Sequence, residues 1–193
     1  MQNYLEYAEF MSLIDGSHRL SLKLATIMAT MGYCGLRLAE ATHLKVQTVF
    51  IGGAIAKTIQ LDPSIAKKAS AREIIIPAPL ADILLRWVVL LTTKRPGCPW
   101  LFPGADDTPM TNRNAQIAIR RLGYQILNRH ITPHTLRHTF GTLLARSAPI
   151  RVVQQALGHK ALSSTMIYTH VNRSDVQNAV TELFPRQEAA NES

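Results

Sequence analysis

The sequence predicts an α+β fold that is mainly α-helical and has a small three-stranded antiparallel sheet. Apolar residues at helical spacing indicate the helices, most clearly in the stripe formed by Leu20, Leu24, Ile27, Met28 and Met31. Two β-rich runs, 46–51 and 54–61, flank Gly52-Gly53 as in a hairpin, and a third run follows at 72–76. The chain has 193 residues, of which 47% are hydrophobic, so it can bury a substantial core.

The remaining pattern places the other elements in chain order. Helices are predicted over 4–14, 20–31, from about 36, over 78–93, over 111–128, after Pro133, over 151–157 and over 175–184. The first of these should end near Asp15-Gly16. Thr111 can cap the helix that follows it, and Gly158 stands where a left-handed C-cap is expected.

Positive charge is concentrated in residues 111–173. This stretch holds nine Lys or Arg and no Asp or Glu, whereas the rest of the chain holds 12 basic and 13 acidic residues, so the whole excess of +8 lies in this stretch. A solvated basic surface would have the same composition. Charge gathered in one segment nevertheless favours a polyanionic partner, and nucleic acid before a membrane, because no basic helix has an aromatic face.

The sequence lacks the features of a membrane or secreted protein. No apolar run is long enough to span a membrane, and no signal peptide is recognisable at the N-terminus. Cys34 and Cys98 form neither a disulfide framework nor a metal-binding spacing. We therefore expect a cytoplasmic protein associated with the nucleoid and with no membrane partner.

Residues 131–170 concentrate groups able to bind a phosphate, together with a tyrosine able to attack it. The apolar stripe of the helix after Pro133 should point inward, which leaves His134, Arg137 and His138 on the other side and free to face a ligand. An arginine fork can bind two phosphate oxygens, and a histidine can move a proton. Tyr168, with an ordinary pKa of about 10, needs such neighbours to become a nucleophile.

The same segment disfavours metal chemistry. A two-metal nuclease needs clustered carboxylates, and residues 111–173 have none. His130, His134 and His138 recur every four residues, which is a weak indication of zinc. Pro133 interrupts a helix through all three, and neither cysteine is near in sequence, so no metal site is expected.

Four motifs, in order, resemble the signature of the tyrosine recombinase (phage integrase) family. They are Gly35-Leu36-Arg37-Leu38-Ala39-Glu40, His134-Thr135-Leu136-Arg137-His138-Thr139-Phe140, Leu157-Gly158-His159 and Tyr168-Thr169-His170. The likeness covers roughly residues 4–184, and four motifs with suitable gaps are far more specific than one.

This resemblance implies the tyrosine recombinase catalytic-domain fold. We expect a single catalytic domain over 1–184, followed by a polar tail at 185–193. The family's separate N-terminal core-binding domain is expected to be absent, which would make the chain either a shortened or a minimal member.

The resemblance also implies the central roles in the site. Arg37 and Arg137 would bind the scissile phosphate. His134 and His159 would hydrogen-bond it or move a proton, and Tyr168 would be the nucleophile.

Further residues would support these. Lys68, in the loop between the second and third β-rich runs, would be the general acid, with Lys67 as the alternative. Glu40 would support the first arginine, and His138 would be structural, a backbone contact or a chemical group. Arg37 and Glu40 could equally form only a surface ion pair, and the unused lysine could be solvated loop charge.

The activity implied is site-specific DNA recombination or integration, as carried out by phage integrases and other mobile elements. Strands would be cut and rejoined through a 3′-phosphotyrosine intermediate, with no metal, ATP or other cofactor. The alternatives are a DNA-binding module without catalysis and DNA relaxation of the type IB topoisomerase kind.

The implied partner is double-stranded DNA. A homotetramer would act on two synapsed sites, and an accessory DNA-bending protein is a further candidate partner. The helix over 175–184 would dock on a neighbouring protomer or pack on its own chain.

Overall fold

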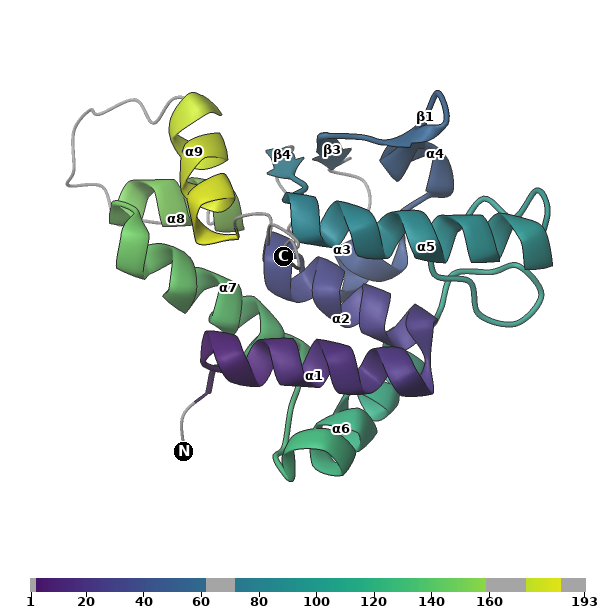
Figure 1. Cartoon of the computed structure of the whole chain (residues 1–193). Helices are drawn as coiled ribbons and strands as arrows, with labels where there is room; N and C mark the ends of the chain where they lie inside the picture. The colour runs from purple at the N-terminus through teal and green to yellow at the C-terminus, as the bar shows by residue number, and fades with distance from the viewer. Residues whose placement is uncertain (1–2, 62–71, 159–172, 185–193) are drawn as a thin grey trace, which may run out of the picture.

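Helices dominate the structure, a computed structural model that describes residues 3–61, 72–158 and 173–184 (Figure 1). The helices are α1 (Tyr7–Leu20), α2 (Leu22–Cys34), α3 (Leu38–Thr42), α4 (Val46–Val49), α5 (Ala78–Lys94), α6 (Asn112–Leu127), α7 (Pro133–Ser147), α8 (Ile150–Leu157) and α9 (Arg173–Leu183). The strands are β1 (Phe50–Ile51), β2 (Ala54–Ile55), β3 (Thr58–Leu61) and β4 (Arg72–Ile75). The predicted class, mainly α-helical with small antiparallel sheets, is confirmed.

The core is built around α2, which lies between α1, α5 and α7 (Figure 1). Every residue from Ala25 to Cys34 is buried. A helix that is buried on all sides must be apolar nearly all round, as this stretch is. One hydrophobic cluster runs from Leu5 to Phe184 and includes side chains from both ends of the described chain.

The predicted end of the first helix at Asp15-Gly16 is wrong, because α1 continues to Leu20. Ser21 then begins α2, its hydroxyl accepting a hydrogen bond from the Leu24 amide at 3.3 Å. Gly16 serves a close approach between helices: a β-carbon there would lie 2.8 Å from the Ile126 side chain of α6. Glycine is therefore explained by packing and not by helix termination.

The strands form two antiparallel pairs where one three-stranded sheet was predicted. In the described residues β1 pairs with β2 and β3 pairs with β4. The hairpin turn at Gly52-Gly53 is confirmed, with φ of +60° and +84° as a type I′ turn requires. Residues 46–49 form a helical turn instead of a strand, and the run 54–61 is divided after Ile55.

The C-terminal half follows the prediction closely. Thr111 caps α6 by accepting a hydrogen bond from the Asn114 amide at 3.2 Å, and Pro133 is the first residue of α7. The inward stripe of α7 is buried as predicted (Leu136, Phe140, Leu143 and Leu144). Within the described part of the chain, no helix is both long and apolar enough to cross a membrane.

Helix α9 packs on its own chain in this structure, against α7, α8 and β4. Val176, Ala179 and Val180 are buried there. Phe184 follows the helix and packs edge-on against Tyr33, with ring centroids 4.5 Å apart.

Candidate active site

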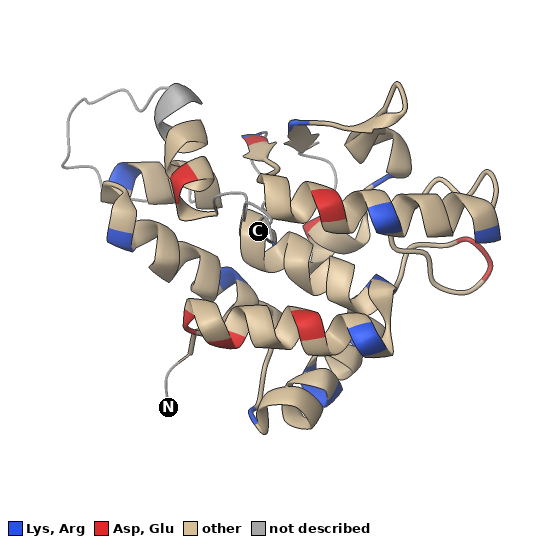
Figure 2. Cartoon of the chain, viewed as in Figure 1, with Lys and Arg blue, Asp and Glu red and all other residues tan. Residues whose placement is uncertain are grey.

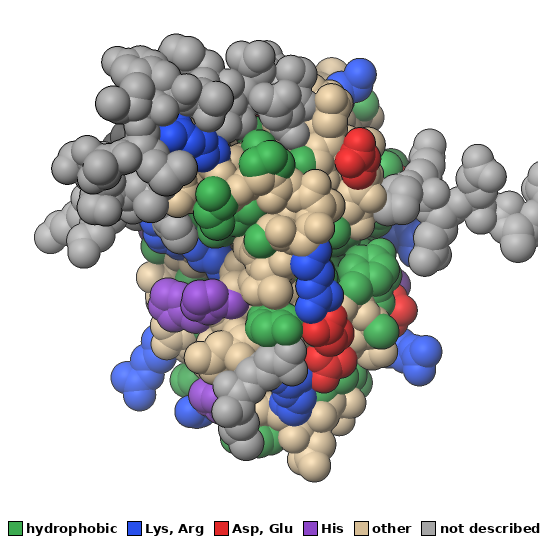
Figure 3. All heavy atoms as spheres, turned by 90° about the vertical axis from the view of Figure 1, so that its left-hand side faces the viewer, with side chains coloured by type: hydrophobic (Ala, Val, Ile, Leu, Met, Phe, Trp, Pro, Cys, Tyr) green, Lys and Arg blue, Asp and Glu red, His purple; other side chains and the backbone are tan. Residues whose placement is uncertain are grey.

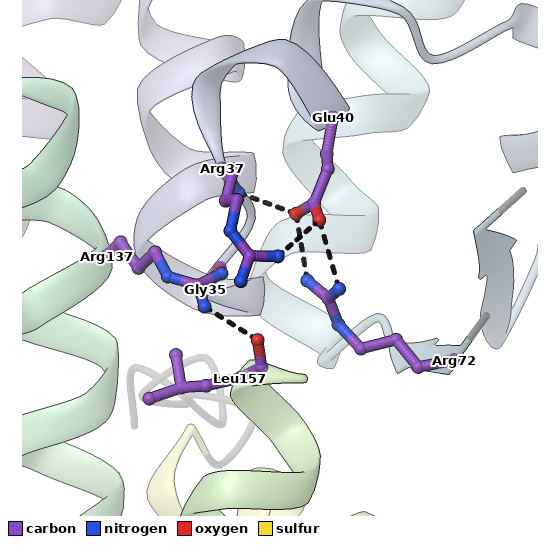
Figure 4. Close-up of polar contacts among 6 residues, drawn as sticks. All are labelled: Gly35, Arg37, Glu40, Arg72, Arg137 and Leu157. Atoms are coloured by element: carbon purple, nitrogen blue, oxygen red, sulfur yellow. Dashed lines mark hydrogen bonds and ion pairs between the residues drawn. The ribbon is translucent and has the colours of Figure 1, made fainter. Parts of the chain in front are cut away.

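Two arginines from distant parts of the sequence bind one buried carboxylate, and a third lies beside them (Figure 4). Glu40 is buried and accepts two hydrogen bonds from Arg72, at 3.0 and 2.9 Å, and one from Arg37 Nη1 at 2.9 Å. The Arg37 backbone amide donates to the same carboxylate at 2.7 Å. Arg137 completes the group from α7.

The turn between α2 and α3 positions Arg37 and Glu40. Helix α2 ends at Gly35 in the left-handed region, with φ of +62°. The next helix begins at Leu38, two residues later than predicted, so Arg37 is its N-cap and Glu40 its third residue. A glutamate at this position normally accepts the N-cap amide, and Glu40 does so while its carboxylate also holds the two guanidinium groups.

The expectation that Arg137 would be exposed beside His134 and His138 is wrong. Both histidines are exposed, but Arg137 is only 9% exposed. Its Nη1 donates to the Gly35 carbonyl at 2.5 Å and its Nη2 to the Leu157 carbonyl at 2.6 Å. Carbonyls at the ends of helices lack partners within the helix, and a guanidinium satisfies them with favourable charge. Arg137 therefore links the ends of α2 and α8.

The pKa values follow from this crowding. Burial, followed by the charges of Arg37 and Arg72, lowers the pKa of Arg137 to about 10. Burial alone would raise the pKa of Glu40, but the hydrogen bonds and charge of Arg72 and the amide of Arg37 lower it overall. At neutral pH the group thus holds three positive charges and one negative, an excess of two that suits an anion.

Two hollows meet at these residues. One, of about 660 Å³, is bordered by Arg37 and Arg137 and continues along α6 past Arg113 and Arg120. The other, of about 640 Å³, continues along α7 and α8. Arg37, His134 and Arg137 line both. Figure 3 shows histidine side chains beside Lys and Arg side chains on this side of the molecule.

The structure thus brings together several residues that the sequence analysis singled out. Arg37, His134 and Arg137 share the groove, Glu40 lies behind Arg37, and His138 borders the second hollow. Gly158 has the predicted left-handed conformation, with φ of +63°. The remaining predicted site residues lie outside the described residues: Lys67, Lys68, His159 and Tyr168.

Arg72 was not among the site residues predicted from the sequence. The strand pattern carried a signal, because Arg72 lies two residues before the buried Ile74 and so on the same face of β4. A charge on the buried face of a strand needs a partner, and Glu40 is that partner.

Part of the basic segment is already neutralised. The coloured residues of α6, α7 and α8 are all basic in Figure 2, while α1 carries acidic ones. Arg129 pairs with Glu9 at 2.5 Å, and Arg146 pairs with Glu6 at 2.7 Å. Because Arg129 and Arg146 are paired, fewer than nine positive charges remain available to an anion. Arg113 and Arg120, on the groove side of α6, therefore supply a larger share of the available charge.

A metal site is a separate question. In the part of the chain that the structure describes, no three His, Cys, Asp or Glu side chains are grouped so that they could hold a metal ion. His130 and His134 line the first hollow with Arg37 and Arg137, where positive charge prevails.

Curated relatives of the chain are named tyrosine recombinases. It is 31% identical over 153 residues to tyrosine recombinase XerC of Azotobacter vinelandii, covering 79% of this chain and 49% of that protein. It is 32% identical over 193 residues to XerC of Bacillus licheniformis, covering 94% and 60%. The chain spans about half the length of the curated relatives it matches.

Solved structures agree on the fold. The crystal structure of XerA recombinase matches with a TM-score of 0.72 and 28% identity, covering 96% of this chain and 66% of that one. XerH recombinase, in a pre-cleavage complex with its difH substrate, matches with a TM-score of 0.68 and 21% identity, covering 93% and 54%. At that identity the likeness to XerH concerns the fold alone.

The family model described as the phage integrase family matches residues 3–175. This range contains the turn that carries Arg37 and Glu40, the strand that carries Arg72 and the helix that carries His134 and Arg137. Because the match extends over most of the sequence, the chain belongs to the phage integrase family, which includes the tyrosine recombinases.

Proposed function

We propose that the chain is the catalytic domain, over 1–184, of a site-specific DNA recombinase or integrase. The observation that carries this proposal is that Arg37 and Arg137, 100 positions apart, border one groove with an excess of two positive charges around it. Membership of the phage integrase family and the names of the curated relatives support it.

The reaction is a transfer of one phosphodiester bond. Tyr168 attacks the scissile phosphorus through its phenolic oxygen, its proton passing to a base for which His134 and His159 are the candidates. The bond from phosphorus to the 5′ oxygen breaks, and that oxygen takes a proton from Lys68 or Lys67. Attack by the 5′ hydroxyl of a second strand then restores a phosphodiester and releases Tyr168. The bond energy is conserved, so the reaction requires no ATP.

Arg37 and Arg137 stabilise the transition state of both steps. When five oxygens surround the phosphorus, extra negative charge builds up on the non-bridging oxygens, and two preorganised guanidinium groups offset that charge. Arg137 is oriented by the carbonyls of Gly35 and Leu157, and Arg37 by Glu40. His134 lies beside both at the edge of the groove.

Double-stranded DNA is the proposed substrate, which would place the protein at the nucleoid. Arg113, Gln116 and Arg120 are exposed at helical spacing on α6 and border the groove, so they would contact the DNA backbone next to the scissile phosphate. The solved structure of XerH, which is bound to its difH substrate, has a similar fold.

We further propose that a homotetramer acts on two synapsed sites, with an accessory DNA-bending protein where the element uses one. Helix α9 buries its apolar face on its own chain. To dock on a neighbouring protomer, α9 would have to leave its own chain and bury the same apolar face on the neighbour.

Trapping the covalent intermediate tests the function. A DNA duplex that spans the end of the mobile DNA element and carries a nick beside the cleavage site should yield a protein–DNA adduct. This adduct should survive denaturing electrophoresis. Tyr168→Phe should form none, whereas Tyr124→Phe, which changes a tyrosine that is 51% exposed, should form as much as the wild type. An adduct in Tyr168→Phe would show that the nucleophile is wrong, and loss of the adduct with chelator would overturn the metal-free reaction.

The alternatives predict other outcomes in the same assay. A DNA-binding module without catalysis would shift the duplex in a native gel and give no adduct. An enzyme of the topoisomerase kind would relax a supercoiled plasmid as a monomer without a paired site.

A further inference from the structure

Arg72 is committed to Glu40 in a way that Arg37 is not. Both terminal nitrogens of Arg72 donate to the carboxylate, one to each oxygen, and its side chain is 7% exposed. Arg37 makes one side-chain hydrogen bond to Glu40, and its side chain is 31% exposed. The buried arginine therefore takes the two-pronged pairing, and the arginine at the groove takes the single bond.

This division of partners decides where positive charge remains. A carboxylate favours one guanidinium in two-pronged geometry and becomes neutralised by it. Arg37 and Glu40 are three residues apart, so without Arg72 they would be free to form that pair with each other. Arg37 would then carry no surplus charge toward the groove.

We propose that Arg72 is a positioning residue, which neutralises Glu40 so that the guanidinium of Arg37 stays available to an anion in the groove. It acts through Glu40 and does not touch the anion. The inference rests on the proposed function only in taking that anion to be the scissile DNA phosphate.

The surroundings of Arg72 fix it in this role. Its backbone belongs to β4, where it pairs with Leu61 of β3. Its side chain lies against Gly158, where a β-carbon would be 2.8 Å from Arg72 Nη1 and 2.9 Å from its Cδ. Arg137 holds the preceding residue, Leu157, through its carbonyl. Arg72 thus joins β4 to α3 and to the same helix end that Arg137 binds.

One detail argues against a role in stability alone. The Nε of Arg72 is buried and has no hydrogen-bond partner among the described residues. Buried donors without partners are costly and are found more often where function requires the arrangement.

The test is a double-mutant cycle on phosphate binding. Inorganic phosphate is titrated into the full chain, and its Kd is read from the ¹⁵N-edited NMR signals of the arginine side chains. Arg72→Met should raise the Kd about tenfold in the wild-type background but less than about twofold in the Glu40→Gln background, because no carboxylate is then left to neutralise Arg37. Arg72→Lys keeps the charge but cannot form the two-pronged pairing, so its Kd should lie between that of the wild type and that of Arg72→Met.

Controls separate this role from others. Arg95→Met removes an arginine paired with Asp107 outside the groove and should leave the Kd unchanged. An equal loss in both backgrounds would mean that Arg72 acts on the anion directly, and no loss in the wild-type background would mean that it does not act at all. Either result overturns the proposal.

Folding and cleavage are read separately. Melting curves accompany each variant, and Arg72→Gln replaces Arg72→Met if the latter does not fold. If neither folds, the pair is structural and the positioning role is refuted. Phosphate binding requires no cleavage, so a wild-type chain that binds phosphate but forms no DNA adduct would refute the proposed function while the cycle still tests Arg72.

Discussion

Replacing Gly35 by alanine should destabilise the fold far more than the same change at Gly52. The two have nearly the same left-handed φ, +62° and +60°. A side chain there costs about 1–2 kcal/mol in strain and regains about 0.4–1 kcal/mol from the stiffer unfolded chain. Nothing lies within 4 Å of a β-carbon at Gly52. We therefore expect Gly52→Ala to cost about 1 kcal/mol.

At Gly35 the new β-carbon would collide with a buried ring. It would lie 2.3 Å from Phe140 Cδ1 and 3.1 Å from Leu157 Cδ2. Carbons in good contact are about 3.5–4.0 Å apart, so the ring would have to move by about 1 Å or more. Phe140 is 2% exposed and belongs to the hydrophobic core, so its ring cannot move aside into solvent. Overpacking adds about 1–3 kcal/mol, which brings the total to about 2–4 kcal/mol.

Thermal unfolding followed by circular dichroism measures the difference. For a protein of this size, each kcal/mol lowers Tm by about 2–4 °C, so Gly35→Ala should melt roughly 5–15 °C below the wild type. Adding Phe140→Leu should cost less in the Gly35→Ala background than alone, because the smaller side chain relieves the contact. If the Gly35→Ala variant has the same Tm as the Gly52→Ala variant, the packing argument is refuted.

Three further predictions concern the charged groups. Arg137→Lys keeps the charge but cannot hold both helix-end carbonyls, so in the nicked-duplex assay it should cleave about 100-fold more slowly while its DNA affinity changes by less than about threefold; a parallel loss of affinity would contradict this. Burial alone would raise the pKa of Glu40, but its arginine partners hold that pKa below 4.5. The ionised carboxylate therefore stabilises the fold above pH 4.5, and this stabilisation is lost as the pH falls through the lowered pKa. Glu40→Gln should therefore cost about 3–5 kcal/mol at pH 7 and less at pH 4 in urea denaturation, and an equal cost at both would contradict the pairing. Arg113→Gln and Arg120→Gln should each reduce the slope of log Kd against log salt by about 1, whereas Arg95→Gln should leave it unchanged.

Local patterns in the sequence were sufficient for most of the helices. The apolar stripe of α7, the Thr111 cap and the left-handed Gly158 depend on residues within a few positions of one another, and all three were predicted correctly. The wrong end of α1 has a nonlocal cause, because the neighbour that explains Gly16 is Ile126 of another helix.

The site shows the same division. The residue types of the motifs and their order identified Arg37, His134 and Arg137. Their meeting at one groove requires the fold to pack α2, and the turn that follows it, against α7. The burial of Arg137 was missed because its partners are carbonyls at the ends of α2 and α8, 102 and 20 positions away. A motif specifies a guanidinium but not the groups that surround it.

Charge shows most clearly what required the tertiary structure. The excess of +8 and its confinement to 111–173 are properties of the sequence. Which of those charges remain available is not, because Arg146 pairs with Glu6 across 140 positions and Arg129 with Glu9 across 120. The pairing of Arg72 with Glu40, 32 positions away, likewise arises only where β4 meets α3. Side-chain chemistry and helical periodicity are local properties that can be read in chain order, whereas the pairing of buried charges depends on which elements pack together.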